Sequence, residues 1–146
     1  MLRRAAAEDA AAVRALTRAA YAKWVPLIGR EPKPMRADYA RAVREHRIDL
    51  ALLADELAGL IETIEQPDHL LIENVAVDPR RQGEGIGRAL LDFAADYARE
   101  HRRPVLRLYT NAAMTENIAF YTRLGYRELD RRTENGFQRV FFDKRL

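Results

Sequence analysis

Three glycines stand at alternate positions in the segment from Gln82 to Arg88, which reads Gln-Gly-Glu-Gly-Ile-Gly-Arg. Glycine lets a backbone approach a ligand closely, and the segment leads directly into an apolar pattern typical of a helix. The first turn of a helix has free N–H groups and a dipole that favour an anion, and Arg80 and Arg81 add positive charge nearby. The combination predicts a phosphate or pyrophosphate site. The alternative is a plain glycine-rich turn before a helix.

Two common phosphate motifs are absent from this segment. A P-loop requires G-x-x-x-x-G-K-[ST], and the chain contains no Gly-Lys pair. A dinucleotide fingerprint requires G-x-G-x-x-G, but counting from Gly83 puts Arg88 at the last position, and counting from Gly85 puts Leu90 there. The glycine loop therefore indicates a different phosphate ligand.

Composition excludes several kinds of chemistry. The chain of 146 residues has no cysteine, which rules out disulfides, thiolate metal sites and a cysteine nucleophile. The histidines His46, His69 and His101 lie far apart without metal-ligand spacing, so no metal is expected. A net charge of +3 is too small to indicate nucleic acid by itself. The sequence also has neither a signal peptide nor an apolar run near the roughly 20 residues of a membrane helix, so we expect a cytoplasmic protein.

Hydrophobic periodicity predicts the order β-α-α-β-β-β-α-β-α-β-β in one domain, residues 1–146. We expect an α/β (α+β) fold in which a mixed sheet has helices on both faces. Two prolines argue against regular helix between Ile28 and Pro34. The strands are expected at 2–5, 49–54, 57–65, 70–77, 105–109, 126–132 and 138–142, and the helices at 8–24, 36–47, 85–102 and 115–124.

The glycine loop resembles the signature Q/R-x-x-G-x-G/A of the GCN5-related N-acetyltransferase (GNAT) superfamily, with Gln82, Gly85 and Gly87 at its fixed positions. Two flanking motifs strengthen the resemblance. Upstream is Val-x-Val-x-Pro, which ends at Pro79, and downstream is Phe-Tyr-x-x-Leu-Gly-Tyr, which begins at Phe120. The likeness extends over the element order of nearly the whole chain.

This resemblance implies a mostly antiparallel sheet of about seven strands and acetyl-CoA as cosubstrate. Strand 70–77 would be central and bulged, and it would splay away from strand 105–109. The pantetheine arm would lie in that gap against the backbone of Val75, Ala76 and Val77. The pyrophosphate would rest on the N–H groups of Gln82, Gly83, Glu84, Gly85, Ile86, Gly87 and Arg88.

Acyl transfer to an amine requires a neutral amine, a donor for the oxyanion and a proton for the leaving thiolate. The family motif implies that Tyr121 is the proton donor, although it could be a core aromatic residue. Glu73 is the candidate general base because it is an acid inside an apolar strand, and an ion-paired carboxylate is the equal alternative. A backbone N–H at the bulge, that of Val75 or Ala76, is the candidate oxyanion donor.

One family feature is missing. Many members have an asparagine seven residues before the tyrosine as a coenzyme contact, and here Met114 occupies that position. Asn117, four residues before Tyr121, is the candidate substitute, with Asn111 in the preceding loop as a second. Both asparagines could equally be capping or turn residues.

The acceptor site is expected by analogy between the first two helices and the loop from Gly29 to Met35. Trp24, Glu31, Asp38 and Tyr39 could surround a cationic amine there. The alternatives are that Trp24 belongs to the core and that the two acids are solvated. The acceptor would be a small-molecule or peptide amine.

Three functional classes are compared on these grounds. The first is an acetyl-CoA-dependent N-acetyltransferase, and the second is a module that binds acyl-CoA without turnover. Tyr121 and Glu73 favour the first, because a pure binder needs neither. The third is a nucleic-acid binder, which is disfavoured because its arginines alternate with acids; these are Arg127, Arg131, Arg132, Arg139 and Arg145. No membrane partner is expected, and the C-terminal strands could pair in a homodimer.

Overall fold

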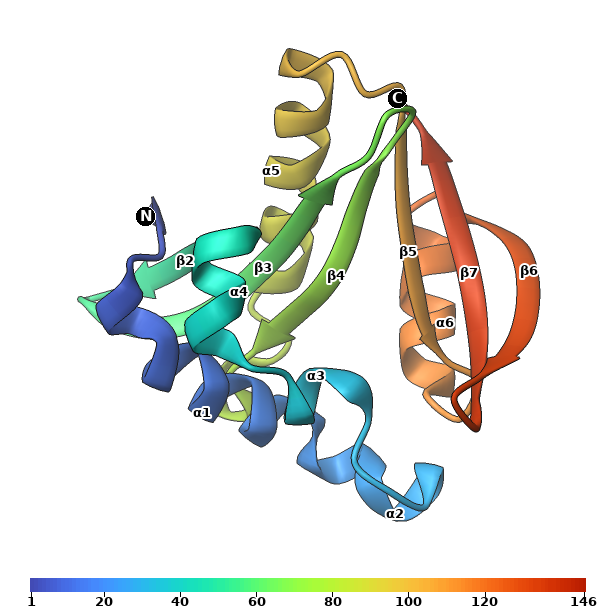
Figure 1. Ribbon diagram of the computed structural model, residues 1–146, viewed down its shortest axis with the longest axis horizontal. Coiled ribbons are helices and arrows are strands. Elements are labelled where there is room, and N and C mark those ends of the chain that lie inside the picture. The colour runs from blue at the N-terminus through green and yellow to red at the C-terminus, as the bar shows by residue number, and fades with distance from the viewer.

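The computed structural model describes all residues, 1–146, and contains one sheet of seven strands in the order β1-β2-β3-β4-β5-β7-β6 (Figure 1). Only the β4–β5 pair is parallel, and every other neighbouring pair is antiparallel. The predicted mixed, mostly antiparallel sheet is therefore confirmed. The strands are β1 Leu2–Arg4, β2 Arg47–Leu53, β3 Glu56–Glu65, β4 Leu70–Val77, β5 Val105–Asn111, β6 Arg127–Glu134 and β7 Phe137–Arg145.

Helices cover both faces of this sheet, as expected from the element order (Figure 1). On one face, α1 (Ala10–Tyr21) and α4 (Tyr39–Glu45) pack on β2 to β4 around Val13, Leu50 and Leu60. On the other face, α5 (Ile86–Glu100) and α6 (Thr115–Arg123) enclose a larger apolar core that includes Leu90, Leu106 and Phe142.

Helix α5 follows the predicted apolar pattern and sits very close to the sheet. Leu90 is fully buried, while Ile86, Phe93 and Tyr97 are half-buried against the same core. A Cβ atom added to Gly59 of β3 would come within 2.9 Å of Ile86 Cγ2. A glycine is thus required where the start of α5 crosses β3, and this close packing fixes the position of the loop that precedes the helix.

The segment between α1 and α4 contains more helix than predicted. After α1, a 3₁₀ turn (Ala22–Trp24) leads into a one-turn helix, α2 (Val25–Ile28), which contains Pro26. Another one-turn helix, α3 (Lys33–Arg36), contains Pro34, so the exclusion of helix up to Pro34 was wrong. Pro26 and Pro34 each lie in the first turn of their helix, where the missing N–H is not needed. The predicted second helix, 36–47, corresponds to α4, which begins at Tyr39 and ends at Glu45.

The central strand β4 is bulged and splays away from its parallel neighbour. Residues 70–72 of β4 pair with 106–108 of β5, and the pairing ends there, so the two strands diverge (Figure 1). On the other side, Ile72 pairs with Thr63 and Asn74 with Glu62, which leaves Glu73 as the extra residue of a β-bulge. The expected splay and bulge are both present, and the bulge lies at Glu73, just before the predicted oxyanion donors.

Candidate active site

The predicted coenzyme residues lie along one groove between the end of β4, the start of α5 and helix α6. This groove has a volume of about 630 Å³. Glu84 is the one predicted coenzyme residue that does not line it. Those that do are Val75, Ala76, Val77, Gln82, Gly83, Gly85, Ile86, Gly87, Arg88 and Asn117.

The glycine loop has the local geometry of an anion site. Gly83 and Gly85 have φ values of +84° and +83°, a left-handed conformation that side chains other than glycine rarely adopt. Gly85 is the N-cap of α5, and no side chain caps the first turn, so its N–H groups are available to a ligand. A Cβ atom added at Gly85 would meet nothing within 4 Å, which means that the loop faces open space.

The three neighbouring arginines have different surroundings. Arg81 and Arg88 line the groove, and Arg81 Nη2 also contacts Glu56 Oε2 at 3.1 Å. Arg80 does not line the groove; its guanidinium lies 2.9 Å from Asp78 Oδ2. This contact holds the pKa of the Asp78 carboxyl below its usual range. Of the three, Arg81 and Arg88 are therefore the arginines placed along the groove.

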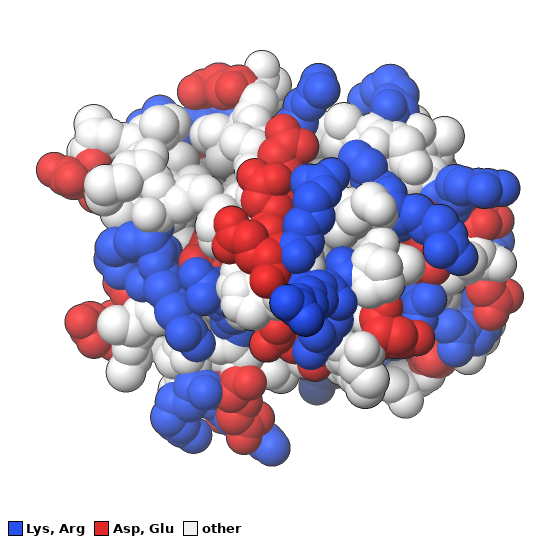
Figure 2. All heavy atoms as spheres, turned by 90° about the horizontal axis from the view of Figure 1, so that it is seen from above, with Lys and Arg blue, Asp and Glu red and all other residues white.

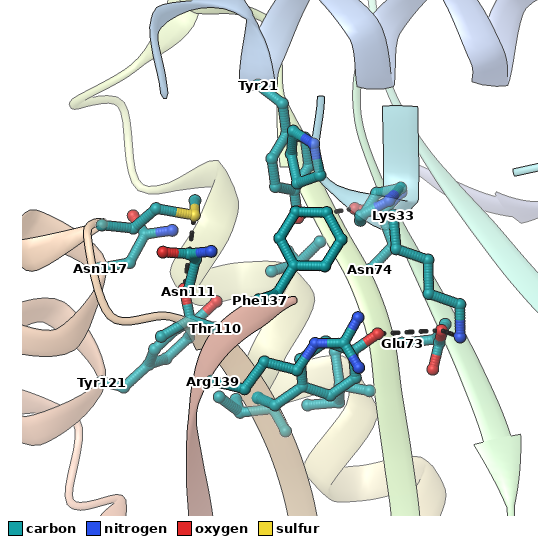
Figure 3. Close-up of a pocket in the computed structure, with 17 residues that line it drawn as sticks. Tyr21, Lys33, Glu73, Asn74, Thr110, Asn111, Asn117, Tyr121, Phe137 and Arg139 are labelled. Carbon is teal, nitrogen blue, oxygen red and sulfur yellow. Dashed lines mark hydrogen bonds and ion pairs between the residues drawn. The ribbon is translucent and has the colours of Figure 1, made fainter. Parts of the chain in front are cut away.

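A second, narrow pocket of about 40 Å³ adjoins the groove, between the diverging strands β4 and β5 (Figure 3). It is bounded by residues of α1, α3, β4, β5, α6 and β7. Phe137, one of its lining residues, is covered by Arg30 from the loop after α2, whose guanidinium lies 3.7 Å from the centre of the Phe137 ring and donates to the Asn135 carbonyl. The groove and the pocket share five lining residues: Tyr21, Val75, Met114, Asn117 and Tyr121.

Tyr121 lies where the two cavities meet. Its side chain packs against Phe120, Tyr126 and Phe142, and the residue is only 5% exposed. Burial raises the pKa of its phenol above the usual range, so the hydroxyl is neutral at physiological pH. The hydroxyl makes no hydrogen bond within the protein. Because every fully buried side-chain oxygen in the structure has a hydrogen-bond partner, this hydroxyl is not fully buried. The hydroxyl therefore opens into the cavities and is free to donate.

Glu73, the predicted base, lies across the pocket from Tyr121 (Figure 3). Its carboxylate is 2.9 Å from Lys33 Nζ and accepts a 3.2 Å hydrogen bond from the Tyr109 hydroxyl. The guanidinium of Arg139 stacks over the Tyr109 ring at 4.7 Å. The carboxylate is thus ion-paired, as the alternative interpretation proposed, and it also faces the pocket, as a base must.

Asn74, which follows the bulge, was not predicted to belong to the site. Its amide nitrogen donates to Thr17 Oγ1 at 3.2 Å and to the Tyr39 hydroxyl at 3.3 Å, and its amide oxygen accepts from the Tyr21 hydroxyl at 3.1 Å. These bonds tie α1 and α4 to β4. Its position beside Glu73 in an apolar strand was a signal that could have identified Asn74. Its hydrogen-bond partners could not be identified in this way, because they are distant in the sequence.

The four residues expected to surround the acceptor are not brought together. Trp24 is buried along the coenzyme groove, and Glu31 Oε2 is held by Arg18 Nη2 at 2.6 Å. The Tyr39 hydroxyl donates to the Pro34 carbonyl at 2.6 Å, and the residue is 2% exposed. Asp38 caps α4 by accepting from the Arg41 N–H at 3.1 Å. Lys33, Tyr21 and Tyr109 instead form the walls of the narrow pocket.

The two asparagine candidates differ in their surroundings. Asn117 lines both cavities from the first turn of α6. Asn111 lines only the narrow pocket, and its side-chain oxygen accepts the Ala113 N–H at 2.9 Å, which is a turn contact. Met114, at the position of the family asparagine, is buried and also lines both cavities. Of the two asparagines, Asn117 is the one placed along the coenzyme groove.

Three of the five C-terminal arginines pair with neighbouring acids. Arg131 contacts Glu128 at 2.9 Å, Arg132 contacts Asp130 at 3.0 Å, and Arg139 contacts Glu134 at 3.0 Å. Basic and acidic side chains also alternate over the face drawn in Figure 2, where an acidic column lies beside a basic one. No cluster of three or more histidine or acidic residues could hold a metal ion, and none of the helices has the length and apolar character to cross a membrane.

Comparison with known proteins establishes the family of this chain. Residues 11–126 match the model of the Acetyltransferase (GNAT) family, so the chain belongs to that family. It is 37% identical over 68 residues to an uncharacterized N-acetyltransferase of Methanocaldococcus jannaschii, covering 47% of this chain and 30% of that protein. It is 38% identical over 61 residues to the ribosomal protein bS18-alanine N-acetyltransferase of Escherichia coli, covering 42% and 41%. The matches span less than half the length of these curated relatives.

Solved structures agree with the fold over the whole chain. PaiA N-acetyltransferase from Thermoplasma acidophilum, crystallised with coenzyme A, superposes with a TM-score of 0.84 at 17% identity, covering 100% of this chain and 98% of that one. The ribosomal-protein-S18-alanine N-acetyltransferase from Escherichia coli superposes with a TM-score of 0.77 at 19% identity, covering 99% and 92%. At these identities the likeness defines the fold alone.

Proposed function

We propose that this chain is an acetyl-CoA-dependent N-acetyltransferase that transfers the acetyl group directly to a primary amine. The observation that carries the proposal is the meeting of two cavities at an unpartnered, neutral Tyr121 hydroxyl. One cavity has the glycine loop expected for a pyrophosphate, and the other has the carboxylate of Glu73. A thioester at the junction would face an amine on one side and a proton donor on the other.

The coenzyme side of the proposal relies on backbone groups. The edge of β4 beyond Ile72 has no pairing with β5, so the peptide groups of Val75, Ala76 and Val77 are candidates to pair with the pantetheine arm. The loop from Gln82 to Arg88 would hold the pyrophosphate through N–H groups at the start of α5. Asn117 would supply a side-chain contact from α6.

The chemical steps are assigned to the residues at the junction. Glu73 would take a proton from the acceptor ammonium, which leaves the neutral amine to attack the thioester carbonyl. The N–H of Val75 or Ala76, just after the bulge, would donate to the developing oxyanion. Tyr121 would hydrogen-bond the departing sulfur and give it a proton, which is replaced by a proton that the new amide nitrogen loses.

A non-catalytic acyl-CoA-binding module is the alternative function. Binding of acyl-CoA alone does not require a carboxylate that faces a phenol across a narrow pocket. The acceptor is either a small molecule or a peptide, and the Escherichia coli relative named for alanine N-acetylation of a ribosomal protein supports including peptide N-termini. Cytoplasmic location and the possible homodimer remain predictions.

Release of coenzyme A tests this function directly. The protein would be incubated with acetyl-CoA and a panel of polyamines, amino acids, aminoglycosides and peptides with free N-termini or lysines. Because the chain has no cysteine, a thiol reagent reports only the released coenzyme. We expect thiol release that depends on at least one amine. Tight acetyl-CoA binding without release for any amine would favour the binding module.

A further inference from the structure

A lysine of the chain itself already occupies the place expected for an acceptor amine. Lys33 Nζ lies 2.9 Å from Glu73 Oε1, and both residues line the narrow pocket that Tyr121 also lines (Figure 3). The Lys33 side chain is 57% exposed, whereas that of Glu73 is only 14% exposed. A primary ammonium on a mobile stem thus contacts the proposed base, in the cavity that adjoins the coenzyme groove.

The choice of lysine at this position is informative. The sequence has only three lysines, Lys23, Lys33 and Lys144, and its other basic residues are arginines. Arginine would pair equally well with Glu73, but its guanidinium does not lose a proton in proteins. Lysine can become a neutral nucleophile once a base accepts its proton. The one lysine in the narrow pocket is therefore also chemically able to react there.

The other two lysines have different surroundings. Lys23 lies 3.7 Å from Glu116 Oε2 and 4.8 Å from the centre of the Trp24 ring, along the coenzyme groove. Lys144 lies on β7, 5.5 Å from the centre of the Tyr126 ring, and lines neither cavity. Neither contacts Glu73, so Lys144 serves as the internal reference for acetylation outside the site, and Lys23 as the reference for an amine that lies along the coenzyme groove without the base.

We propose that Lys33 is a self-acetylation site, modified by the active site of its own chain. This inference rests on the proposed function. Glu73 takes one proton from the Lys33 ammonium, and the neutral Nζ forms a bond to the thioester carbonyl carbon. The carbon–sulfur bond then breaks, and its electron pair leaves on the sulfur. Of the two protons that the ammonium loses in total, one reaches the sulfur through Tyr121 and the other passes from Glu73 to solvent.

Two features distinguish this reaction from ordinary acetylation by acetyl-CoA in solution. The reacting groups belong to one chain, so the rate per molecule is independent of protein concentration. Lys33 is also held beside its base, so the effective concentration of the base near this lysine is high. Lys23 and Lys144 lack this advantage. We therefore expect Lys33 to be labelled at least about tenfold faster than either reference lysine, a low estimate for groups held together.

The experiment uses the purified full chain with acetyl-CoA and no added amine. Intact mass spectrometry follows addition of one acetyl group, and peptide mapping locates it. We expect the label on Lys33, at a rate independent of protein concentration and strongly reduced by Tyr121→Phe. Lys33→Arg should remove the label, whereas the matched variant Lys144→Arg should leave it unchanged.

Several outcomes would overturn the proposal. Equal labelling of all three lysines would indicate solution chemistry, and a rate that rises with protein concentration would indicate transfer between molecules. A wild-type protein that acetylates an added amine while Lys33 stays unlabelled would refute self-acetylation and leave the proposed function intact. If neither Lys33 nor any added amine is acetylated while acetyl-CoA still binds, the proposed function itself fails.

Discussion

The coenzyme groove and the narrow pocket are built in different ways. In the groove, the residues expected to hold the pantetheine arm and the pyrophosphate lie in one continuous stretch, from Val75 to Arg88, and are expected to act mainly through backbone N–H and C=O groups, while the end of α1 and helix α6 supply the rest of the lining. The pocket depends on side chains from α1, α3, β4, β5, α6 and β7, which meet only in the folded chain. Its volume is also much smaller, about 40 Å³ against about 630 Å³.

This difference separates a general function from a specific one. A backbone cradle recognises a phosphate group whatever the surrounding side chains are, because every residue has the same peptide groups. A pocket of side chains changes with each substitution and can select one amine. We therefore expect the groove to be sensitive to backbone changes and the pocket to be sensitive to single side-chain atoms.

The largest expected effect comes from removing one oxygen atom at the junction. Tyr121→Phe keeps the packing against Phe142 but removes the free hydroxyl, so the leaving sulfur loses its proton donor. We expect kcat to fall by about 10²- to 10⁴-fold, the usual worth of general acid catalysis, with little change in acetyl-CoA affinity. Steady-state kinetics and calorimetry measure the two quantities.

Tyr126→Phe is the matched control for this prediction. Tyr126 belongs to the same aromatic cluster and is equally buried, but it lines neither cavity. We expect its kcat to stay close to wild type. Equal losses in both variants would mean that the phenols matter for packing and that Tyr121 is not the acid.

In the groove, a change in the preferred backbone conformation should instead lower the affinity for acetyl-CoA. Gly85→Val places a β-branched residue at φ +83°, where strain of about 1–3 kcal/mol will reshape the loop. This energy corresponds to a loss of about 5- to 150-fold in acetyl-CoA affinity. Calorimetric titration measures the affinity, and circular dichroism checks that the protein remains folded.

Gly87→Ala provides the comparison within the same loop. Gly87 does not have a positive φ, and a new Cβ atom would make ordinary contacts, 3.7 Å from Val77 Cγ2 and 3.8 Å from Phe120 Cζ. Its acetyl-CoA affinity should change by no more than about twofold, within the roughly 0.5 kcal/mol that a substitution without strain usually entails. If Gly85→Val binds as tightly as Gly87→Ala, the loop does not hold the pyrophosphate.

The same contrast explains how much the sequence could reveal. The glycine loop and helix α5 were predictable because each depends on the conformation of adjacent residues. The same holds for the turn between the expected strands 126–132 and 138–142, where Asn135 and Gly136 have φ values of +51° and +79°. The strand order near β4 followed from the family resemblance. These are the parts of the molecule in which local preference and final structure agree.

The narrow pocket could not be assembled from the sequence. The bulge at Glu73 depends on the register of β4 against β3, and the Lys33–Glu73 pair joins residues forty positions apart. Trp24 was expected near the acceptor, but it lies along the coenzyme groove, at the end of the helical turn that follows α1. Periodicity within one segment contains no information about such contacts between segments.

A smaller effect is expected from Glu73→Gln, which keeps the shape of the side chain and removes its charge. The variant can no longer accept a proton, so fewer acceptor molecules are neutral when they reach the thioester. We expect kcat/KM for the amine to fall about tenfold at neutral pH, less than a full general-base effect, because solvent also deprotonates the amine. Glu65→Gln, at the far end of β3, is the control and should have no effect.

The pH profile sharpens this test. An alkyl amine has a pKa near 10.4, so its neutral fraction rises about tenfold for each pH unit below that value. The rate of Glu73→Gln should therefore rise toward that of the wild type as the pH increases. A constant ratio between the two rates from pH 7 to pH 9 would argue that Glu73 positions Lys33 or the substrate and is not the base.

Over the ordinary pH range, the smallest expected effect is on the free energy of unfolding. Burial raises the pKa values of Tyr21, Tyr39, Tyr109 and Tyr121 around the pocket, because the folded protein disfavours the phenolate. In the unfolded chain these phenols ionise near pH 10. Their contribution to the free energy of unfolding is therefore fully present below about pH 10 and is lost as the pH rises further, by up to about 1.4 kcal/mol per tyrosine and pH unit.

Urea unfolding at pH 8, 9, 10 and 11 measures this effect, with phenolate absorbance followed in parallel. We expect nearly constant stability up to pH 9 and a steep loss above pH 10, with the buried phenols ionising only as the protein unfolds. The groove should behave differently from the pocket, because its backbone N–H ligands do not titrate in this range. Acetyl-CoA affinity that declines well before stability does would therefore show that titrating side chains, rather than the backbone cradle, dominate coenzyme binding.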